Sequence, residues 1–142
     1  MERTAEAHWE GELRTGKGSI RLGSGAFDGK YSFATRFEDS PGTNPEELLG
    51  AAHAGCFTMA LANTLAKAGR PAVRIDTTAK VHLEKVGEGF GVTGIDLVTR
   101  GVVPGASAEE FKRAADDMGA NCIISRALKA VPIRVEATLT SG

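Results

Sequence analysis

The two cysteines of this 142-residue chain, Cys56 and Cys122, are the side chains best suited to covalent chemistry. Two thiols cannot supply the four ligands of a zinc ribbon, and they are too few for the disulfide framework of a small secreted protein. Cys56 lies inside an uncharged segment, which is typical of a small buried apolar residue. Cys122 directly follows Asn121 where a short helix is expected, and free N–H groups at a helix start favour a thiolate. The residues therefore leave two interpretations open: inert core cysteines, or a redox-active pair.

A metal site is the main alternative use of Cys56. His53 and Cys56 are three residues apart on an expected helix, a spacing that places two potential ligands on one face. The chain has 3 histidines, His8, His53 and His82, and no further ligands cluster near this pair in the sequence. Because protein metal sites normally use three or four ligands, we expect no metal and no cofactor. We expect His53 to be a packed helix residue near a subunit interface.

The charge balance argues against two classes of partner. The chain has 17 Lys and Arg residues and 18 Asp and Glu residues, and its formal net charge is −1. These charges are spread along the sequence, so no basic patch is present for nucleic acid or for an anionic membrane surface. A length of 142 residues with 42% apolar side chains predicts one globular domain, residues 1–142. We therefore expect neither nucleic acid nor a membrane as a partner.

One uncharged segment, residues 48–66, is nearly long enough to span a bilayer. It contains four polar side chains, which are His53, Thr58, Asn63 and Thr64. We therefore predict that this segment is a helix buried in protein. The polar N-terminus lacks the apolar region of a secretory signal, which predicts a cytoplasmic protein with reduced thiols.

A long helix is predicted from Asn44 to Lys67. Asn44 suits the N-cap because its side-chain oxygen can accept a free backbone N–H, and Pro45 suits the first helical position. Glu46 and the acidic residue after it complement the positive end of the helix dipole. Gly69 is expected to end the helix.

Strands are predicted on both sides of this helix. Short strands separated by glycines are expected at residues 7–14, 18–22 and 31–37. Residues 72–86 alternate apolar and polar side chains, and a Gly-Glu-Gly turn leads to an antiparallel partner strand at 90–103. A last alternating strand is expected near the C-terminus, from Pro132 to Thr140.

A second helical segment is predicted between the last two of these strands. Ser107 and Glu110 form a capping box ahead of a helix that stops near Gly119. Asn121 is expected to cap a short third helix that carries Cys122. Strands joined by hairpins and followed by helices predict an α+β fold, with an antiparallel sheet around the long central helix.

Several strings of the sequence resemble the OsmC/Ohr family, which comprises osmotically inducible protein C and the organic hydroperoxide resistance proteins. The most specific string is GTNPEELLGAAHAGCFTMAL at residues 42–61. Further strings match in order and cover essentially the whole chain: AHWEG at 7–11, TRFEDSPG at 35–42, IDTTAKVHLEKV at 75–86, VPG at 103–105 and NCIISRALKA at 121–130. The Thr-Arg-Phe-Glu element and the lack of long insertions indicate the OsmC branch. The resemblance implies an OsmC-like fold and an intertwined homodimer.

This resemblance implies a thiol-dependent peroxidase, with a response to oxidative and osmotic stress, that uses neither metal nor cofactor. Cys56 matches the peroxidatic cysteine and Cys122 matches the resolving cysteine. Arg36 matches the arginine that assists the peroxidatic thiolate, and Glu46 matches the glutamate that pairs with this arginine. Cys56 is expected to attack the peroxide, after which Cys122 forms a disulfide that an external dithiol reduces.

The residue types suit that chemistry. A thiol with an ordinary pKa of about 8.5 is only ~3% ionised at pH 7, and a neighbouring guanidinium favours the reactive thiolate. The resemblance implies organic hydroperoxides as substrates, hydrogen peroxide as a weaker one, and a dithiol reductant of the dihydrolipoyl type. Four apolar residues are expected to line the substrate path: Phe57, Met59, Leu48 and Leu49.

The spacing on the long helix limits how this site can be assembled. Glu46 and Cys56 are ten residues apart, about 15 Å along an α-helix, so they should not touch within one chain. We therefore predict a site at the dimer interface, in which Arg36 and Glu46 face Cys56 of the other chain. Two other functions remain as alternatives: a cysteine-based redox sensor, and a dimeric ligand-binding scaffold with inert cysteines.

Overall fold

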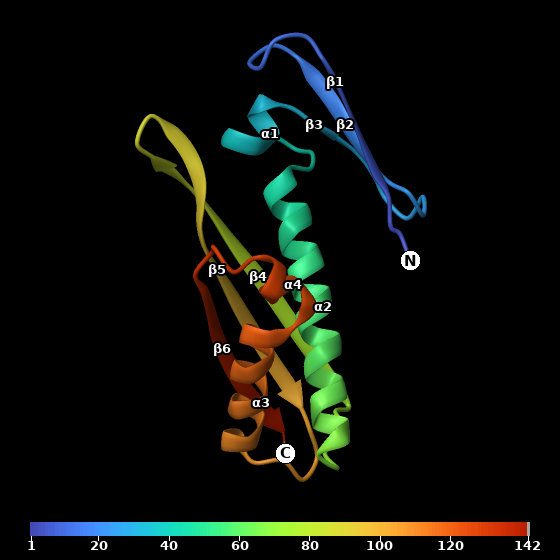
Figure 1. Ribbon diagram of the computed structural model, residues 1–142, viewed down its shortest axis with the longest axis vertical. Coiled ribbons are helices and arrows are strands. Elements are labelled where there is room, and N and C mark those ends of the chain that lie inside the picture. Colours follow the sequence, from blue (N-terminus) through green and yellow to red (C-terminus); the bar gives the residue numbers. More distant parts are fainter. Residues whose placement is uncertain (142) are drawn as a thin grey trace. The chain divides into compact units, whose positions relative to one another are not determined.

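The computed structural model describes residues 1–141, and the chain divides into two compact units. The first unit comprises residues 1–48, and the second begins at residue 49. Helix α2 (Pro45–Lys67) starts in the first unit and continues through the second, as Figure 1 shows in green. The prediction that residues 1–142 act as one domain stays a prediction, and each unit is described by itself below.

The first unit contains a three-stranded antiparallel sheet. Strands β1 (Ala5–Glu10), β2 (Lys17–Leu22) and β3 (Asp28–Tyr31) pair in the order β1-β2-β3. The rings of Trp9 and Tyr31 pack against each other across this sheet with their centroids 5.3 Å apart. The strand predicted at residues 7–14 ends earlier, at Glu10, because Gly11 has a φ of 90° and turns the chain.

The prediction of a strand at residues 31–37 is wrong for most of its length. After β3 the chain forms a short helix, α1 (Phe33–Phe37). The cause is a reciprocal cap between Ser32 and Thr35: Thr35 N donates to Ser32 Oγ at 3.2 Å, and Ser32 N donates to Thr35 Oγ1 at 2.8 Å. This helix carries Arg36, one of the predicted site residues.

The second unit contains a mixed sheet of three strands. Strands β4 (Arg74–Val86) and β5 (Gly89–Val102) form the predicted antiparallel hairpin, and Gly87 in its tight turn has a φ of 61°. Strand β6 (Ile133–Ser141) pairs with β5 in parallel, so the order is β4-β5-β6. A parallel pair needs a crossover connection, which here consists of helices α3 (Ala108–Asn121) and α4 (Ile123–Ala127).

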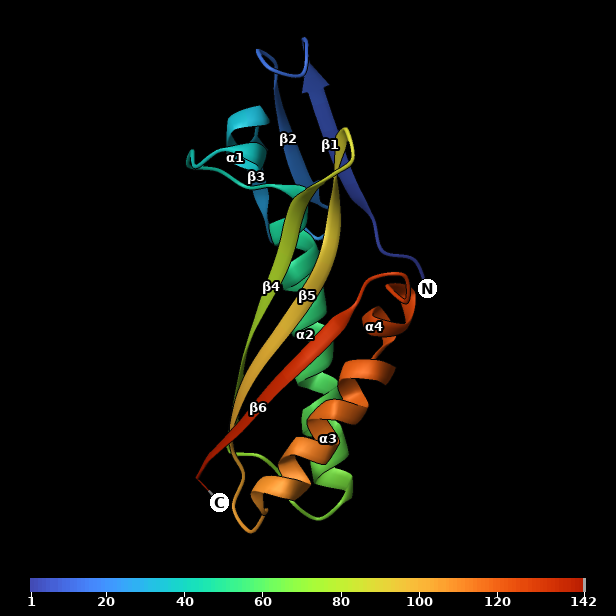
Figure 2. The same cartoon turned by 90° about the vertical axis from the view of Figure 1, so that its left-hand side faces the viewer.

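The core of the second unit lies between this sheet and its helices. Figure 2 shows α3 and the later part of α2 on the same side of β4–β6. Side chains from α2, α3 and the sheet pack together in this core. The large buried ones are Phe57, Leu61, Leu65, Ile95, Leu97, Val103 and Phe111. The α+β prediction is confirmed, but the sheet of this unit is mixed where an antiparallel one was expected, because β6 runs parallel to β5. The same packing positions both cysteines: Cys122 belongs to the buried cluster and Cys56 packs against it.

Helix α2 begins and ends as its sequence predicts. Glu47 N donates to Asn44 Oδ1 at 2.7 Å, and Gly69, with a φ of 77°, lets Arg70 N donate back to Leu65 O at 2.8 Å. By length and composition α2 is long and apolar enough to cross a membrane, with a mean hydropathy of 1.2. Its side chains Phe57 and Leu61 are fully buried in the core of the unit, but only 28% of the apolar stretch is buried, so the prediction of a helix buried in protein is met by only part of its surface.

Candidate functional site

Helix α2 holds Cys56 with its sulfur toward the start of α4. The Cys56 side chain is half-buried, and Ile124 N donates a hydrogen bond to Cys56 Sγ at 3.5 Å. Ile124 stands in the first turn of α4, where backbone N–H groups have no partner within the helix. An N–H donor at this position stabilises a thiolate more than a thiol, because the hydrogen bond strengthens with the charge on sulfur.

Cys122 has a different local role from the predicted one. Asn121 was expected to cap the short helix, but it is the last residue of α3, and its Nδ2 donates to Asp117 O at 3.0 Å. Cys122 itself is the N-cap of α4, and its Sγ accepts a hydrogen bond from Ser125 N at 3.4 Å. Cys122 is also buried, with 3% of its surface exposed. The thiol therefore occupies the capping position that a serine or asparagine oxygen usually takes.

The two cysteines meet at one end of α4. Consecutive backbone N–H groups of its first turn, from Ile124 and Ser125, each donate to one of the sulfurs. Both thiols are free, so the structure has the reduced form of the pair. The sequence left open whether the two sulfurs come together, and the packing of α4 against α2 brings them to the same helix end.

Arg36 and Glu46 form an ion pair in the first unit. Arg36 Nη2 donates to Glu46 Oε1 at 2.6 Å, and Arg36 Nε donates to Glu46 Oε2 at 3.2 Å. The Glu46 side chain is 11% exposed, whereas that of Arg36 is 38% exposed. This forked contact holds the guanidinium in one plane while part of it stays open to solvent.

Local structure explains why this ion pair forms. Arg36 is in α1, and Glu46 is in the first turn of α2. Asn44 Nδ2 donates to Thr35 O at 3.2 Å, which ties the start of α2 to α1. The structure thus brings the four predicted site residues together as two pairs, Arg36 with Glu46 in one unit and Cys56 with Cys122 in the other.

Ser125 is a polar residue of this region that the sequence analysis did not single out. Its Oγ lies 3.1 Å from Cys122 Sγ and 2.7 Å from His53 Nε2. Both His53, at 0% exposure, and Ser125, at 3%, are buried. Burial lowers the pKa of His53 below its ordinary value, because a charged imidazolium is poorly solvated there. The signals in the sequence were the Cys-x-x-Ser spacing of residues 122–125 and the His-x-x-Cys spacing of residues 53–56.

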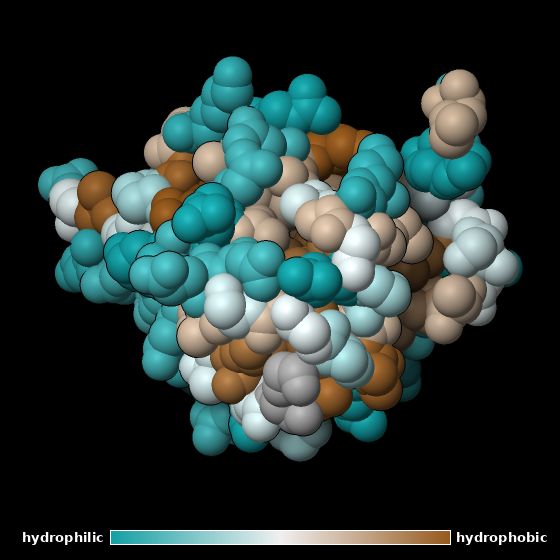
Figure 3. Space-filling model, turned by 90° about the horizontal axis from the view of Figure 1, so that it is seen from below, coloured by the Kyte–Doolittle hydropathy of each residue, from teal (hydrophilic) through white to brown (hydrophobic). Residues whose placement is uncertain are grey.

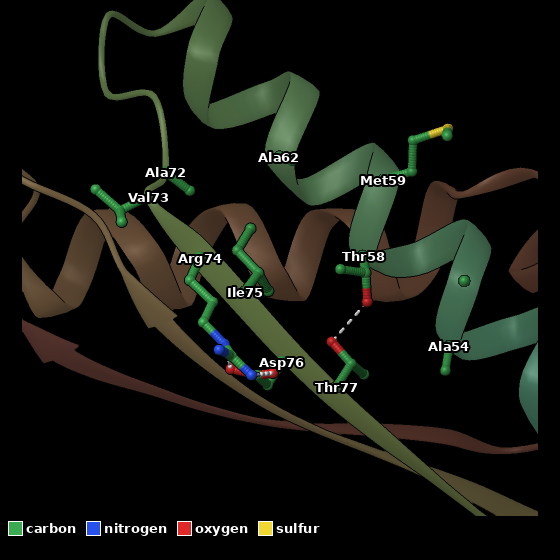
Figure 4. A pocket seen from close by; sticks show the side chains of 11 residues that line it. Ala54, Thr58, Met59, Ala62, Ala72, Val73, Arg74, Ile75, Asp76 and Thr77 are labelled. Carbon is green, nitrogen blue, oxygen red and sulfur yellow. Dashed lines mark hydrogen bonds and ion pairs between the residues drawn. The ribbon is translucent and has the colours of Figure 1, made fainter.

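The substrate path predicted from apolar residues needs one correction. Phe57 is 0% exposed and belongs to the core of the second unit, so it cannot line a path open to substrate. Met59 is 77% exposed and stands beside a groove of about 560 Å³ between α2 and β4. Figure 4 shows Met59 pointing away from β4, while Thr58 donates to Thr77 Oγ1 at 2.7 Å across the groove. No cysteine lines this groove.

Apolar surface is left open in the second unit. Val73, at the end of the groove, is 72% exposed, and a Cβ built on Gly55 would meet nothing within 4 Å. Gly50, in contrast, lies against β4, where a Cβ would approach Val81 Cγ2 to 3.2 Å. The space-filling view in Figure 3 also shows hydrophobic atoms uncovered between hydrophilic side chains. Gly50 thus serves packing within the chain, whereas Gly55 keeps an exposed helix face flat.

The described part of the chain has no group of three or more His, Cys, Asp or Glu side chains arranged to hold a metal ion. His53 and Cys56 share a helix face, but His53 Nε2 is engaged by Ser125. The backbone N–H of Ile124 donates to Cys56 Sγ, and the hydroxyl and backbone N–H of Ser125 contact Cys122 Sγ.

The chain is similar to known proteins in sequence and in fold. Residues 37–136 match the family described as OsmC-like protein. The chain is 47% identical over 131 residues to peroxiredoxin OsmC of Escherichia coli, covering 92% of each chain. It superposes on an organic hydroperoxide resistance protein from Elizabethkingia anophelis with a TM-score of 0.73 at 23% identity, covering 100% of this chain and 99% of that one. An organic hydroperoxide resistance protein of Bacillus subtilis gives a TM-score of 0.71 at 24% identity, with 96% and 98% covered.

Proposed function

Because the chain belongs to the OsmC-like protein family, we propose that it is a thiol-dependent peroxidase that reduces organic hydroperoxides and, more weakly, hydrogen peroxide. The observation that carries this proposal is the meeting of two free thiols at the start of α4, where each sulfur accepts a backbone N–H. The peroxiredoxin of Escherichia coli, at 47% identity, supports the same reaction class.

Cys56 is the peroxidatic residue of the proposed reaction. Its thiolate attacks the distal oxygen of the hydroperoxide, a sulfur–oxygen bond forms and the oxygen–oxygen bond breaks. The leaving alkoxide takes up a proton and departs as an alcohol, and Cys56 is left as a sulfenic acid. Cys56 suits this step better than Cys122 because it is half-buried and not fully enclosed.

Cys122 is the resolving residue. Its sulfur attacks the sulfenic sulfur of Cys56, so that a disulfide forms and the sulfenic oxygen leaves as water. An external dithiol, of the dihydrolipoyl type by family resemblance, then reduces the disulfide by thiol exchange and is itself oxidised. The reaction needs no metal and no other cofactor, because the two sulfurs carry all the electrons.

Arg36 and Glu46 complete the proposed site. The guanidinium favours the thiolate of Cys56 and holds a peroxide oxygen, and Glu46 fixes the plane of the guanidinium through its two-point contact. Glu46 and Cys56 are ten residues apart on α2, about 15 Å along the helix. We therefore place the site at the interface of a homodimer, where Arg36 and Glu46 of one chain face Cys56 of the other.

Exposed apolar surface supports this assembly. The groove beside Met59 and Val73 and the flat helix face at Gly55 are suited to burial against a second copy. The family match spans residues 37–136 and so includes parts of both units, which supports one functional domain over residues 1–142. We place the protein in the cytoplasm, where dithiol reductants are present, with a role under oxidative or osmotic stress and no nucleic acid or membrane partner.

Peroxide consumption in the presence of dihydrolipoate tests this function. Wild-type protein should turn over an organic hydroperoxide repeatedly, and Cys56→Ser should be inactive. Cys122→Ser should form a sulfenic acid that reagents can trap but no intramolecular disulfide. Retained activity in Cys56→Ser would overturn the proposal, and oxidation of wild type without sustained turnover would favour a redox sensor instead.

A further inference from the structure

His53 and Ser125 form a buried chain of polar groups that ends on the Cys122 sulfur. His53 Nε2 is 2.7 Å from Ser125 Oγ, and Ser125 Oγ is 3.1 Å from Cys122 Sγ. Among the described residues, His53 Nδ1 has no hydrogen-bond partner. The hydrogen bond between His53 Nε2 and Ser125 Oγ therefore holds the imidazole in place. His53 is fully buried, and burial of an imidazole nitrogen without a hydrogen-bond partner lowers the free energy of unfolding. A leucine at this position would fill the same space without that cost, which points to a chemical role for the histidine.

We propose that His53, acting through Ser125, accepts the proton that Cys122 loses when it attacks the sulfenic acid of Cys56. This inference rests on the proposed function, because it concerns the second step of that reaction. Ser125 touches the reacting sulfur, and His53 is a positioning residue that acts through Ser125. A histidine suits this role because burial lowers its pKa and keeps its imidazole neutral at pH 7. The role requires the tautomer protonated at Nδ1, in which Nε2 accepts the hydrogen bond from the Ser125 hydroxyl.

The protons and electrons of the step balance. The Cys122 proton moves to Ser125 Oγ while the Ser125 hydroxyl proton moves to His53 Nε2. The Cys122 sulfur then bonds to the Cys56 sulfur as the sulfur–oxygen bond breaks, and the leaving hydroxide gains a proton from water. When His53 gives its proton back to solvent, the net change is one thiol and one sulfenic acid converted to a disulfide and water.

A pocket beside Ser125 gives the proton held by His53 a route to solvent. Ser125 lines a pocket of about 330 Å³ near α3 and β6, whose charged side chains are Asp116 and Lys129. Two thiols lie near His53: Cys56, three residues along the same helix, and Cys122, which contacts Ser125. The inner side of the sheet facing α2 contributes apolar and hydroxyl side chains such as Ile95, Leu97 and Thr99.

Single-turnover kinetics of reduced protein with one equivalent of an organic hydroperoxide tests the relay. Mass spectrometry of quenched samples counts the reduced, sulfenic and disulfide forms, so the two steps are timed separately. His53→Gln keeps a polar atom near Ser125 but cannot accept a proton. It should form the sulfenic acid at the wild-type rate and form the disulfide about 100-fold more slowly at pH 7, which is the lower end of what a positioned proton acceptor contributes.

A pH series separates a proton relay from simple positioning. As the pH rises and hydroxide can take the Cys122 proton directly, disulfide formation in His53→Gln should approach the wild-type rate. A Cys122 that is merely displaced would stay slow at every pH, and that result would overturn the proposal. Ser125→Ala should behave as His53→Gln does, whereas Ser125→Thr, which keeps the hydroxyl, should recover most of the rate.

Two controls make the outcome decisive. His82→Gln changes a histidine that contacts Asp96 on the sheet at 2.7 Å and should leave both steps unchanged. If wild type itself forms no sulfenic acid, the proposed function fails. If wild type passes through both steps and His53→Gln resolves at the same rate at pH 7, the relay alone fails.

Discussion

At the scale of single residues, the site depends on which groups surround each sulfur. Cys56 and Cys122 each accept one N–H from the same turn of α4, so the helix end does not distinguish them. Their other surroundings do: Cys122 is buried and contacts the Ser125 hydroxyl, whereas Cys56 is half-buried. These surroundings support the proposed roles, in which Cys56 reacts with peroxide and Cys122 resolves the sulfenic acid.

Replacement of Arg36 should slow the attack on peroxide. Arg36→Ala removes the cation that favours the thiolate, and we expect sulfenic acid formation to slow by about 10- to 100-fold. Arg36→Lys keeps the charge but loses the forked contact with Glu46. Its rate of sulfenic acid formation should lie between those of Arg36→Ala and wild type. Rapid-mixing measurement of peroxide-dependent thiol oxidation gives these rates. Arg21→Ala, an exposed change on β2, is the control, and equal rates in Arg36→Ala and wild type would remove Arg36 from the site.

His53 should also make stability depend on pH. Its pKa in the folded protein is lowered from 6.5 by burial, so below about pH 6.5 the unfolded chain binds a proton that the folded chain resists. The free energy of unfolding should therefore fall as the pH drops from 6.5 toward the folded pKa. Urea unfolding across this range should show a shallower fall for His53→Gln than for wild type. The exposed change His8→Gln should keep the wild-type slope, and an unchanged slope in His53→Gln would contradict the prediction.

At the scale of helices and strands, local capping rules account for much of what the sequence predicts correctly. The start of α2 at Asn44 and the capping box at Ser107 both form as expected, because each depends on residues within one turn. The alternation in residues 72–86 likewise predicts β4, since one of its faces is buried. These features need no knowledge of distant contacts.

The predictions from sequence failed at helices with unusual N-caps and at contacts between segments that are far apart in the chain. The Ser32–Thr35 cap converts an expected strand into α1, and Cys122 caps α4 although thiols are not favoured N-caps. The contact of His53 with Ser125 joins residues 72 positions apart, which no local rule predicts. The pairing of Arg36 with Glu46 was predicted from the family resemblance alone, because nothing in the local sequence of either residue indicates its partner.

The capping box of α3 provides a stability test at this scale. Glu110 N donates to Ser107 Oγ at 3.1 Å, and Ser107 N donates to Glu110 Oε2 at 2.7 Å. Ser107→Ala should lower the free energy of unfolding by about 1 kcal/mol, measured by chemical denaturation. Ser107→Asp, which keeps a capping oxygen, should recover most of the loss. If alanine and aspartate behave alike, the cap does not stabilise α3.

At the scale of the whole molecule, the proposed dimer predicts that two defective chains can restore one site. A heterodimer of Cys56→Ser with Arg36→Ala contains one intact Cys56 and one intact Arg36, on different chains. If Arg36 faces the partner's thiol, this heterodimer should have about half the wild-type activity per dimer, although each parent homodimer is impaired. Co-expression with two affinity tags isolates it. Activity no higher than that of the parents would show that each chain serves its own thiol.

The exposed face of α2 predicts how the dimer can be weakened. Met59 is 77% exposed beside the groove, and Met59→Glu would place a charge on a surface suited to burial. Sedimentation should show a shift toward monomer in this variant. Ala68→Glu, an exposed change near the end of the same segment, is the matched control. A Met59→Glu protein that sediments like wild type would exclude this face from the interface.

The position of both sulfurs at the start of α4 also links the redox state of the cysteines to the thermal stability of the protein. The disulfide proposed between residues 56 and 122 would join α2 to the crossover helices and close a long loop in the unfolded chain. Loop-closure entropy for such a length corresponds to about 4 kcal/mol. The oxidised protein should therefore melt at a higher temperature than the reduced protein, and each catalytic cycle alternates between a tethered and a looser molecule.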